Sequence, residues 1–288
     1  TVKVLPFLGE YSWSVIIASL VLAFCVAAVL IGGVKRIASV SQIIVPFMAV
    51  IYIVFVLVLV VCNITAVPAA FATIVKAAFS PKAITGGAVG SFLVAMQKGV
   101  ARGIFSNEAG LGSAPIAAAA AQTKEPVRQG LVSMTGTFID TIVICTLTGL
   151  SIVLTGAWQV DGLEGVQVTT YAFQNGLPFP KELSAFVLML CLVFFAFTTI
   201  LGWDYYSERC LEYLSGGRMK YVMVYRWIYI LAVFIGPYMT VSAVWTIADI
   251  FNGLMALPNM IALFALSGVV VKETKHFFER HRNGEIED

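Results

Sequence analysis

The sequence predicts an all-α, polytopic transmembrane helix bundle, and three observations lead to this fold class. Only 12% of the 288 residues are charged, whereas a soluble domain carries about 25%. Hydrophobic residues make up 59% of the chain, and the mean hydropathy is +0.92. Five stretches without Asp, Glu, Lys or Arg each reach the roughly 20 residues that cross a ~30 Å hydrocarbon core. These stretches are 11–34, 37–75, 183–203, 227–248 and 250–271.

The spans are expected to be helical, because only helices and closed barrels satisfy their backbone in lipid and no strand-like alternation is present. Pro258 is expected to bend the last span. A short surface helix and a loop are expected at 68–87, and a long loop at 157–182. The chain is interpreted as a single transmembrane domain, 1–288, with 272–288 as a soluble cytoplasmic tail. Seven spans are predicted, the third of them interrupted: 13–33, 42–64, 89–122, 128–156, 183–213, 221–237 and 241–271.

The orientation follows from the loop charges. Basic residues gather on alternate connections, and the connection at 157–182 on the other side is mainly acidic; Lys76 and Lys82 are exceptions. Because cytoplasmic loops carry an excess of Lys and Arg, the basic connections are assigned to the cytoplasm. The expected location is the plasma (inner) membrane, with several passes. The basic connections are 34–41, 122–128, 209–226 and the tail.

The third span contains the polar stretch "VARGIFSNEAGLGSAPIAAAAAQ", where a spanning helix would carry leucine. The helical pieces on either side each cover about half of the hydrocarbon core, so an unwound segment at 103–113 is expected near the bilayer midplane. Carbonyls around Gly103–Phe105 could accept from an ammonium group or coordinate Na+. Amides near Ser113 and Pro115 would lie at the positive end of a second half-helix of about ten residues, with Ser113 as its cap.

Broken helices of this kind bind amino acids in many secondary transporters. The alternative is a glycine-hinged kink whose polar groups are satisfied by neighbouring helices. The combination of glycines with Ser106, Asn107 and Glu108 at midplane depth favours a binding site, because polar groups there are costly.

The fifth span carries a second polar cluster in the run "FFAFTTILGWDYYSERCLEY". The hydroxyls of Thr198 and Thr199, with the carbonyl of Phe195 one turn earlier, are hard oxygen donors that suit a sodium ion. Trp203 follows Thr199 by four residues and therefore lies on the same face. The alternative is that the threonines bond to their own helix and that Trp203 is an interfacial anchor.

Three further polar residues are candidates for a gate or for coupling. Arg102 could form an outer-gate salt bridge, or a static structural pair. Glu108 could balance a substrate amine, or form a charge pair or cap the backbone inside the break. Asp140, in the fourth span and flanked by Thr137 and Thr141, could assist cation binding, or hydrogen-bond to neighbouring hydroxyls or pair with a basic residue.

The remaining acidic residues are expected to be structural. Asp249 and Asn252 are expected to organise the packing of the last span. Asp204, Glu208 and Glu212 recur every four residues beside Arg209, which indicates a solvated helix end with surface ion pairs of little energetic value.

Five segments of the sequence resemble the alanine or glycine:cation symporter family, which contains the sodium:alanine symporters. The resemblance covers nearly the whole chain. It implies a LeuT-type fold of two inverted five-helix repeats, and alternating-access symport of small neutral amino acids with Na+ as the coupling ion and no other cofactor. The spans would be core helices four to ten, so the N-terminal helices one to three are missing from this chain. The segments are "GGVKRIASVSQIIVPFMA", "GVARGIFSNEAGLGSAP", "TKEPVRQGLVSMTGTFIDT", "FAFTTILGWDYYSE" and "IADIFNGLMALPN".

The resemblance also implies roles for individual residues. Sodium ligands would be Thr198, Thr199 and the carbonyl of Phe195. The bulk of Phe105 and Trp203 would restrict the pocket to alanine or glycine. The implied substrate contacts are Phe105, Ser106, Asn107 and Gly110 on the sixth helix, and Thr199 and Trp203 on the eighth.

Other classes of function fit less well. An enzyme is not expected, because the only histidines are His276 and His281 in the tail, and neither an HExxH motif nor a serine–base pairing is visible. An ion channel could use midplane carbonyls as a filter, but filters usually arise from symmetric repetition and one break is visible. A non-transporting membrane subunit stays open. The expected partners are a small neutral amino acid, Na+ and the lipid bilayer, and no nucleic acid.

Overall fold

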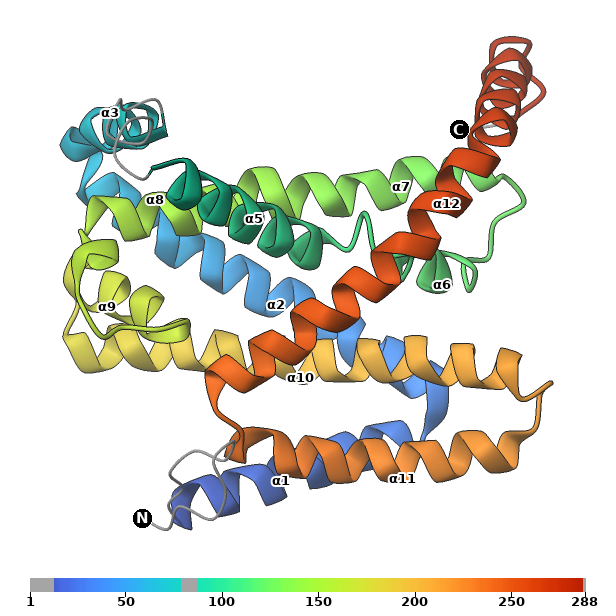
Figure 1. The fold of residues 1–288 in the computed structure, drawn as a ribbon, viewed down its shortest axis with the longest axis horizontal. Helices are drawn as coiled ribbons and strands as arrows, with labels where there is room; N and C mark the ends of the chain where they lie inside the picture. Colours follow the sequence, from blue (N-terminus) through green and yellow to red (C-terminus); the bar gives the residue numbers. More distant parts are fainter. Residues whose placement is uncertain (1–12, 79–87, 287–288) are drawn as a thin grey trace. The chain divides into compact units, whose positions relative to one another are not determined.

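A computed structural model describes residues 13–78 and 88–286, and all regular elements within these ranges are helices (Figure 1). Six helices are long and apolar enough to cross a membrane, which confirms six of the seven predicted spans and a multi-pass membrane protein. The predicted third span is divided between two shorter helices. The six are Trp13–Leu30, Lys35–Cys62, Pro126–Leu154, Lys181–Leu214, Met219–Tyr238 and Val241–Arg282.

The chain forms two compact units, each described here by itself. Unit 1 consists of Thr1–Phe79 and Thr146–Trp245, and unit 2 of Ser80–Cys145 and Thr246–Asp288.

Unit 1 is built around its longest helix, α10 (Lys181–Leu214). This helix packs against α2 (Gly33–Cys62) and α11 (Met219–Ile235), which lie on either side of it in Figure 1, and against α1 and α9. The other helices of unit 1 are α1 (Trp13–Leu30), η1 (Ile64–Ala66), α3 (Val67–Ala78), α8 (Thr146–Leu154), η3 (Ala157–Gln159), α9 (Val166–Gly176) and η4 (Gly236–Tyr238).

Two apolar cores hold α10 in place. One contains Leu30 and Leu201, and the other contains Leu59, Phe173 and Leu188; all five are fully buried. Lipid tails are as apolar as these side chains, so close packing rather than escape from water must supply most of the attraction between the helices.

The predicted loop at 157–182 contains helices η3 and α9, so the prediction of a simple loop is wrong. Phe173 of α9 is fully buried and stacks on Tyr52 of α2. Asn63 donates from one amide to the carbonyls of Leu59 and Gly176, at 2.8 and 2.9 Å. A Cβ on Gly176 would lie 2.8 Å from Leu59, so only glycine allows this approach of α9 to α2. The short helix expected near 68–87 is present as α3.

Unit 2 contains α5 (Ala88–Asn107), α6 (Ala114–Ala118), α7 (Pro126–Phe138), the π-helix η2 (Ile139–Cys145) and most of α12 (Val241–Arg282). Helix α12 continues to Arg282, so most of the predicted soluble tail is helical. Its end is tied to the connection before α7 by an ion pair of 3.1 Å between Arg280 and Glu125. Pro258 lies inside α12, and the bend expected there stays a prediction.

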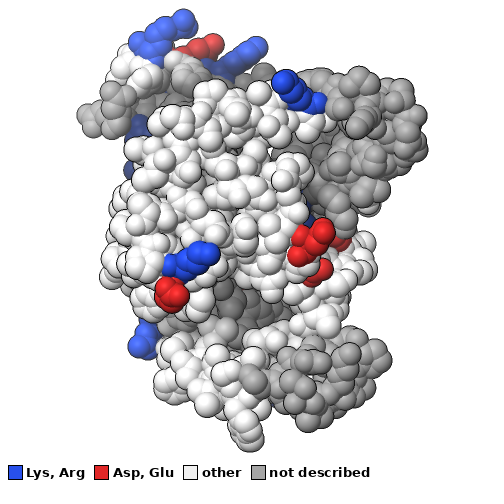
Figure 2. Space-filling view, turned by 90° about the vertical axis from the view of Figure 1, so that its left-hand side faces the viewer, with Lys and Arg blue, Asp and Glu red and all other residues white. Residues whose placement is uncertain are grey.

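Large apolar side chains cover much of the surface, among them Phe24 and Phe264, which are about three-quarters exposed. Charged side chains are few and scattered on the face shown in Figure 2. A surface of this kind is expected where lipid rather than water surrounds the helices.

Candidate substrate and sodium sites

The predicted helix break is present in unit 2, but it is shorter than expected. Helix α5 continues to Asn107 and α6 begins at Ala114, so the non-helical stretch is 108–113 and not 103–113. Phe105, Ser106 and Asn107 consequently lie on the last turn of α5. Helix α6 has five residues rather than about ten, which leaves little helix dipole at Ser113 and Pro115.

The backbone of the break adopts conformations that ordinary residues avoid. Glu108 has φ 56°, and it is the one non-glycine residue with positive φ in the described ranges. Gly112 has φ 79°. The left-handed region costs a side-chain-bearing residue about 1–2 kcal/mol, and such strain is concentrated at functional sites.

Side chains within the stretch and from α12 hold the break in this shape. The Ser113 hydroxyl donates to the Glu108 carboxylate at 2.8 Å, and the backbone N–H of Ala109 donates to the Asn107 side-chain oxygen at 3.0 Å. The Asn259 amide of α12 donates to the Gly110 carbonyl at 3.0 Å. Ser113 occupies the predicted N-cap position of α6, but it is 1% exposed and its side chain makes no capping bond to that helix. Its hydroxyl is used by Glu108 instead.

Asn259 is a residue that sequence reasoning missed. It follows Pro258 in a largely apolar part of α12, and a polar side chain at membrane depth marks a specific interaction. A Cβ on Gly112 would lie 3.1–3.2 Å from Asn259, so the absence of a side chain at Gly112 allows this close approach of α12 to the break.

The start of the break is bonded to the π-helix η2. The Ser106 hydroxyl donates to the Asp140 carboxylate at 2.7 Å, and the Asn107 amide donates to the Thr141 hydroxyl at 2.9 Å. Asp140 therefore hydrogen-bonds to a hydroxyl of a facing helix, which sequence reasoning did not expect, and also accepts a long bond from Thr141. A π-helix is rare and occurs frequently at functional sites.

Arg102, one turn before Phe105, forms an ion pair with Asp249 of α12. The two guanidinium nitrogens lie 2.9 and 3.1 Å from the two carboxylate oxygens. Both side chains are about one-third exposed. Asp249 thus contributes to helix packing as expected, and Arg102 is its partner.

The proposed sodium ligands lie in unit 1, on α10. Thr198 is 9% exposed, and its hydroxyl donates to the carbonyls of Phe194 and Phe195 at 3.0 and 3.1 Å. Thr198 thus bonds to carbonyls of its own helix, as the alternative to a sodium ligand predicted. The hydroxyl keeps a lone pair, whereas the Phe195 carbonyl accepts from Thr198 in addition to its backbone bond within the helix.

The other two candidates on α10 are more accessible. Thr199 is exposed, and Trp203 is half-buried with its ring edge-to-face against Tyr206 at 5.7 Å. Their assignment to the substrate site stays a prediction.

The acidic residues that follow on α10 correct another expectation. Asp204 is 0% and Glu208 2% exposed, so the predicted solvated helix end begins only after them. Glu208 accepts two bonds, of 2.6 and 2.9 Å, from Arg226. Arg226 was assigned to a basic connection, but α11 begins at Met219 and places this guanidinium against α10. Glu212 and Arg209 do form the expected surface pair.

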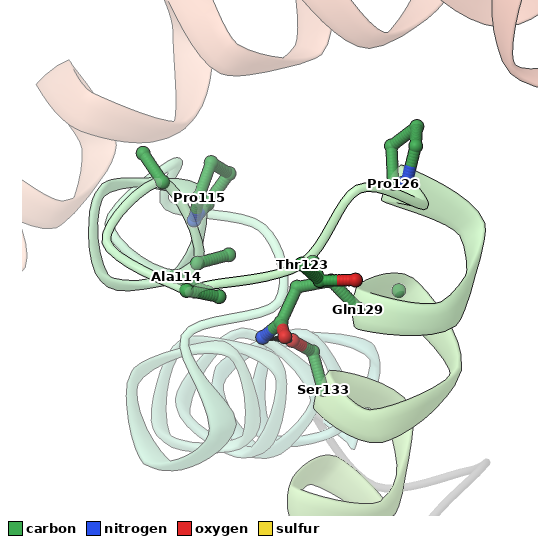
Figure 3. A pocket seen from close by; sticks show the side chains of 10 residues that line it. Ala114, Pro115, Thr123, Pro126, Gln129 and Ser133 are labelled. Carbon is green, nitrogen blue, oxygen red and sulfur yellow. Dashed lines mark hydrogen bonds between the residues drawn. The ribbon is translucent and has the colours of Figure 1, made fainter.

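A groove of about 490 Å³ lies between α6 and α7 in unit 2 (Figure 3). Its wall is formed mostly by alanines and by Pro115 and Pro126, with a polar edge where Gln129 donates to Ser133 at 3.3 Å. The alanine run at 117–121 provides the small side chains that leave this space.

Comparison with known proteins identifies relatives along the whole chain. The sequence profile of the sodium:alanine symporter family matches residues 5–288. An uncharacterized transporter of Haemophilus influenzae is 54% identical over 267 residues, covering 92% of this chain and 58% of the relative. The sodium/alanine symporter AgcS of Methanococcus maripaludis is 49% identical over 271 residues, covering 93% of this chain and 58% of the relative.

A third relative is the amino-acid carrier protein AlsT of Bacillus subtilis, 37% identical over 276 residues, which cover 96% of this chain and 57% of that protein. The chain thus spans a little over half the length of the curated relatives that it matches.

Proposed function

The chain belongs to the sodium:alanine symporter family, and we propose that the protein carries small neutral amino acids across the plasma membrane together with Na+, by alternating access. The observation that supports this best is the non-helical stretch 108–113, with Glu108 in the left-handed region, inside a bundle of membrane helices. A relative of this chain carries the name sodium/alanine symporter. The proposal includes the LeuT-type arrangement of inverted repeats.

The substrate contacts proposed in unit 2 are Phe105, Ser106, Asn107 and Gly110. The zwitterion offers an ammonium group and a carboxylate, and the end of α5 offers acceptors and donors within a few residues. The Gly110 carbonyl is fixed in direction by Asn259. The Asn107 side chain is fixed by Thr141 and by the amide of Ala109. Groups held in this way lose little freedom on binding, which favours affinity.

Thr199 and Trp203 on α10 are proposed as the substrate contacts of unit 1, and the sodium ligands proposed there are Thr198, Thr199 and the carbonyl of Phe195. The Thr198 hydroxyl lies 3.1 Å from the Phe195 carbonyl, so both oxygens already lie on one side of the helix. A hard monovalent cation favours such oxygen donors.

The polar pairs around the break are proposed to couple substrate binding to conformational change. The Ser106–Asp140 hydrogen bond joins α5 to η2, and the Arg102–Asp249 ion pair joins α5 to α12. Each pair joins two separate helices. If substrate binding at the break weakened one of these bonds, the two helices that it joins could move relative to each other. The Glu108–Ser113 bond lies within the break itself.

The test is uptake of labelled alanine by the full-length protein in proteoliposomes, with Na+ outside and with K+ replacing it. We expect uptake that saturates and that needs the sodium gradient. Asn107→Ala and Thr199→Ala should abolish it. The matched controls are Asn175→Ala and Thr73→Ala, whose side chains are exposed and bond only to their own helices. Uptake that is indifferent to sodium would refute the coupling, and uptake that never saturates would indicate a channel.

A further inference from the structure

Asp204 is a fully buried carboxylate, and no hydrogen-bond donor in the described part of the chain is bonded to it. The residue is 0% exposed, and neither Oδ1 nor Oδ2 has a hydrogen-bond partner. It lies on α10 in unit 1, one turn before Glu208. Glu208, the other buried acidic residue in the described ranges, contrasts with it, because both of its oxygens accept from Arg226.

The charges around Asp204 do not balance if it is ionised. Glu208 holds the guanidinium of Arg226, whose side chain is 12% exposed, in a two-pronged contact, so an ionised Asp204 would add a second negative charge beside one positive charge. From α11, Tyr225, Arg226 and Tyr229 are the titratable groups near Asp204.

The remaining helices packed against α10 supply no countercharge. Helices α1 and α9 contain no Asp, Glu, Lys, Arg or His, and their titratable groups are Cys25 and Tyr171. On α2, Lys35 and Arg36 are exposed, and within the described ranges neither forms an ion pair with Asp204. The other titratable groups of α2 are Tyr52, which bonds to Thr148 instead, and Cys62, which is exposed at the end of the helix.

An isolated buried carboxylate is so costly that the group normally binds a proton instead. A metal ion is a poorer solution here, because it needs several oxygen ligands. The Tyr229 hydroxyl donates to the Ile200 carbonyl at 2.8 Å, and the Glu208 oxygens are held by Arg226. No cluster of three or more potential metal-binding side chains exists in the described part of the chain. A proton needs only one oxygen.

We propose that Asp204 is a proton-binding site, separate from the helix break: a proton taken from water forms an O–H bond with one carboxylate oxygen, which neutralises Asp204 while the Glu208–Arg226 pair stays charged. The proton returns to water when water reaches this end of α10. Ionisable side chains inside membrane bundles commonly serve in proton relays. Only the link between this proton and amino-acid transport rests on the proposed function.

The test is infrared difference spectroscopy on the purified full-length protein in lipid, stepped through neutral pH, with and without 13C-labelled aspartate. We expect the C=O band of a protonated carboxyl that shifts with the aspartate label. The band should be lost in Asp204→Asn and kept in Asp161→Asn, which removes an exposed aspartate. In Asp204→Glu the band should shift with labelled glutamate instead. No label-sensitive band in the wild-type protein, or a band that survives Asp204→Asn, would overturn the proposal.

Alanine uptake separates this proposal from the proposed function. With a fixed sodium gradient, the dependence of uptake on pH should be lost in Asp204→Asn and kept in Asp161→Asn. If the protein shows no sodium-dependent uptake, the proposed function fails while the infrared band still decides the proton site. If uptake is normal and the band is missing, only the proton site is refuted.

Discussion

The side-chain amide of Asn259 donates a hydrogen bond of 3.0 Å to the carbonyl of Gly110, and this bond joins α12 to the middle of the helix break. The carbonyl has no helical partner at that point, and an unsatisfied backbone group inside a membrane bundle is costly. Asn259 therefore stabilises the non-helical stretch by supplying a donor to this carbonyl.

Asn259→Leu should lower both thermal stability and alanine uptake. The substitution leaves the Gly110 carbonyl without its donor, at a cost of about 1–3 kcal/mol. The measurement is the fraction of detergent-solubilised protein that stays monodisperse after heating, compared with Asn175→Leu at an exposed position of α9. Equal stability of the two variants would contradict the role given to Asn259.

Gly112→Ala and Gly103→Ala should have opposite effects. Gly112 has φ 79° and faces Asn259, so alanine there should cost about 1–2 kcal/mol. Gly103 lies within α5 and a Cβ there would meet nothing within 4 Å, so alanine should stabilise by about 0.5–1 kcal/mol. Thermal unfolding curves of Gly112→Ala and Gly103→Ala, each compared with the wild-type protein, measure both changes in stability. A loss of stability in Gly103→Ala would show that the unwound segment begins earlier than Glu108.

Arg226→Met should be among the most destabilising single changes in unit 1. It leaves Glu208 as a buried, uncompensated charge, which costs about 3–5 kcal/mol. The double variant Glu208→Leu/Arg226→Met should recover most of the loss, because apolar pairs often replace buried ion pairs without penalty. Arg209→Ala removes a surface pair and should cost about 0–1 kcal/mol. Denaturation by heat or detergent ranks the three, and an Arg226→Met protein as stable as Arg209→Ala would refute the burial of this pair.

Ser106→Ala and Asp140→Asn should not act independently on transport. Their 2.7 Å hydrogen bond predicts a coupling of about 0.5–3 kcal/mol in a double-mutant cycle on the rate of alanine uptake. Ser133→Ala, on α7 outside this contact, should combine additively with Asp140→Asn and serves as the control. Full additivity of Ser106→Ala with Asp140→Asn would show that the contact has no part in the transport cycle.

Features with a strong local pattern could be predicted from the sequence. Long apolar stretches located six membrane helices, and the glycines with Ser106 and Asn107 located the break to within a few residues. The boundary was misplaced because Gly103 suggested an unwound start, whereas the backbone there stays helical and the strain is concentrated at Glu108 and Gly112.

Features that depend on a distant partner could not be predicted in this way. The acidic run of α10 has the pattern of a solvated helix end, and only the position of Arg226, 18 residues further on, explains why Glu208 is buried. Asn259 has no local signal that identifies Gly110 as its acceptor. Helix α9 buries Phe173 against α2, and nothing in the local sequence identifies this distant partner.

The π-helix η2 has a geometric consequence for Asp140. In a π-helix each backbone hydrogen bond joins residues five apart instead of four, so each hydrogen-bonded ring encloses one more residue than in an α-helix. If η2 returned to the ordinary i to i+4 register, the residues before it would rotate by about 100° relative to those after it. Asp140 would then point in a different direction relative to Ser106, which is now its hydrogen-bond donor. A change of hydrogen-bond register within Ile139–Cys145 would therefore reorient a side chain that contacts the break.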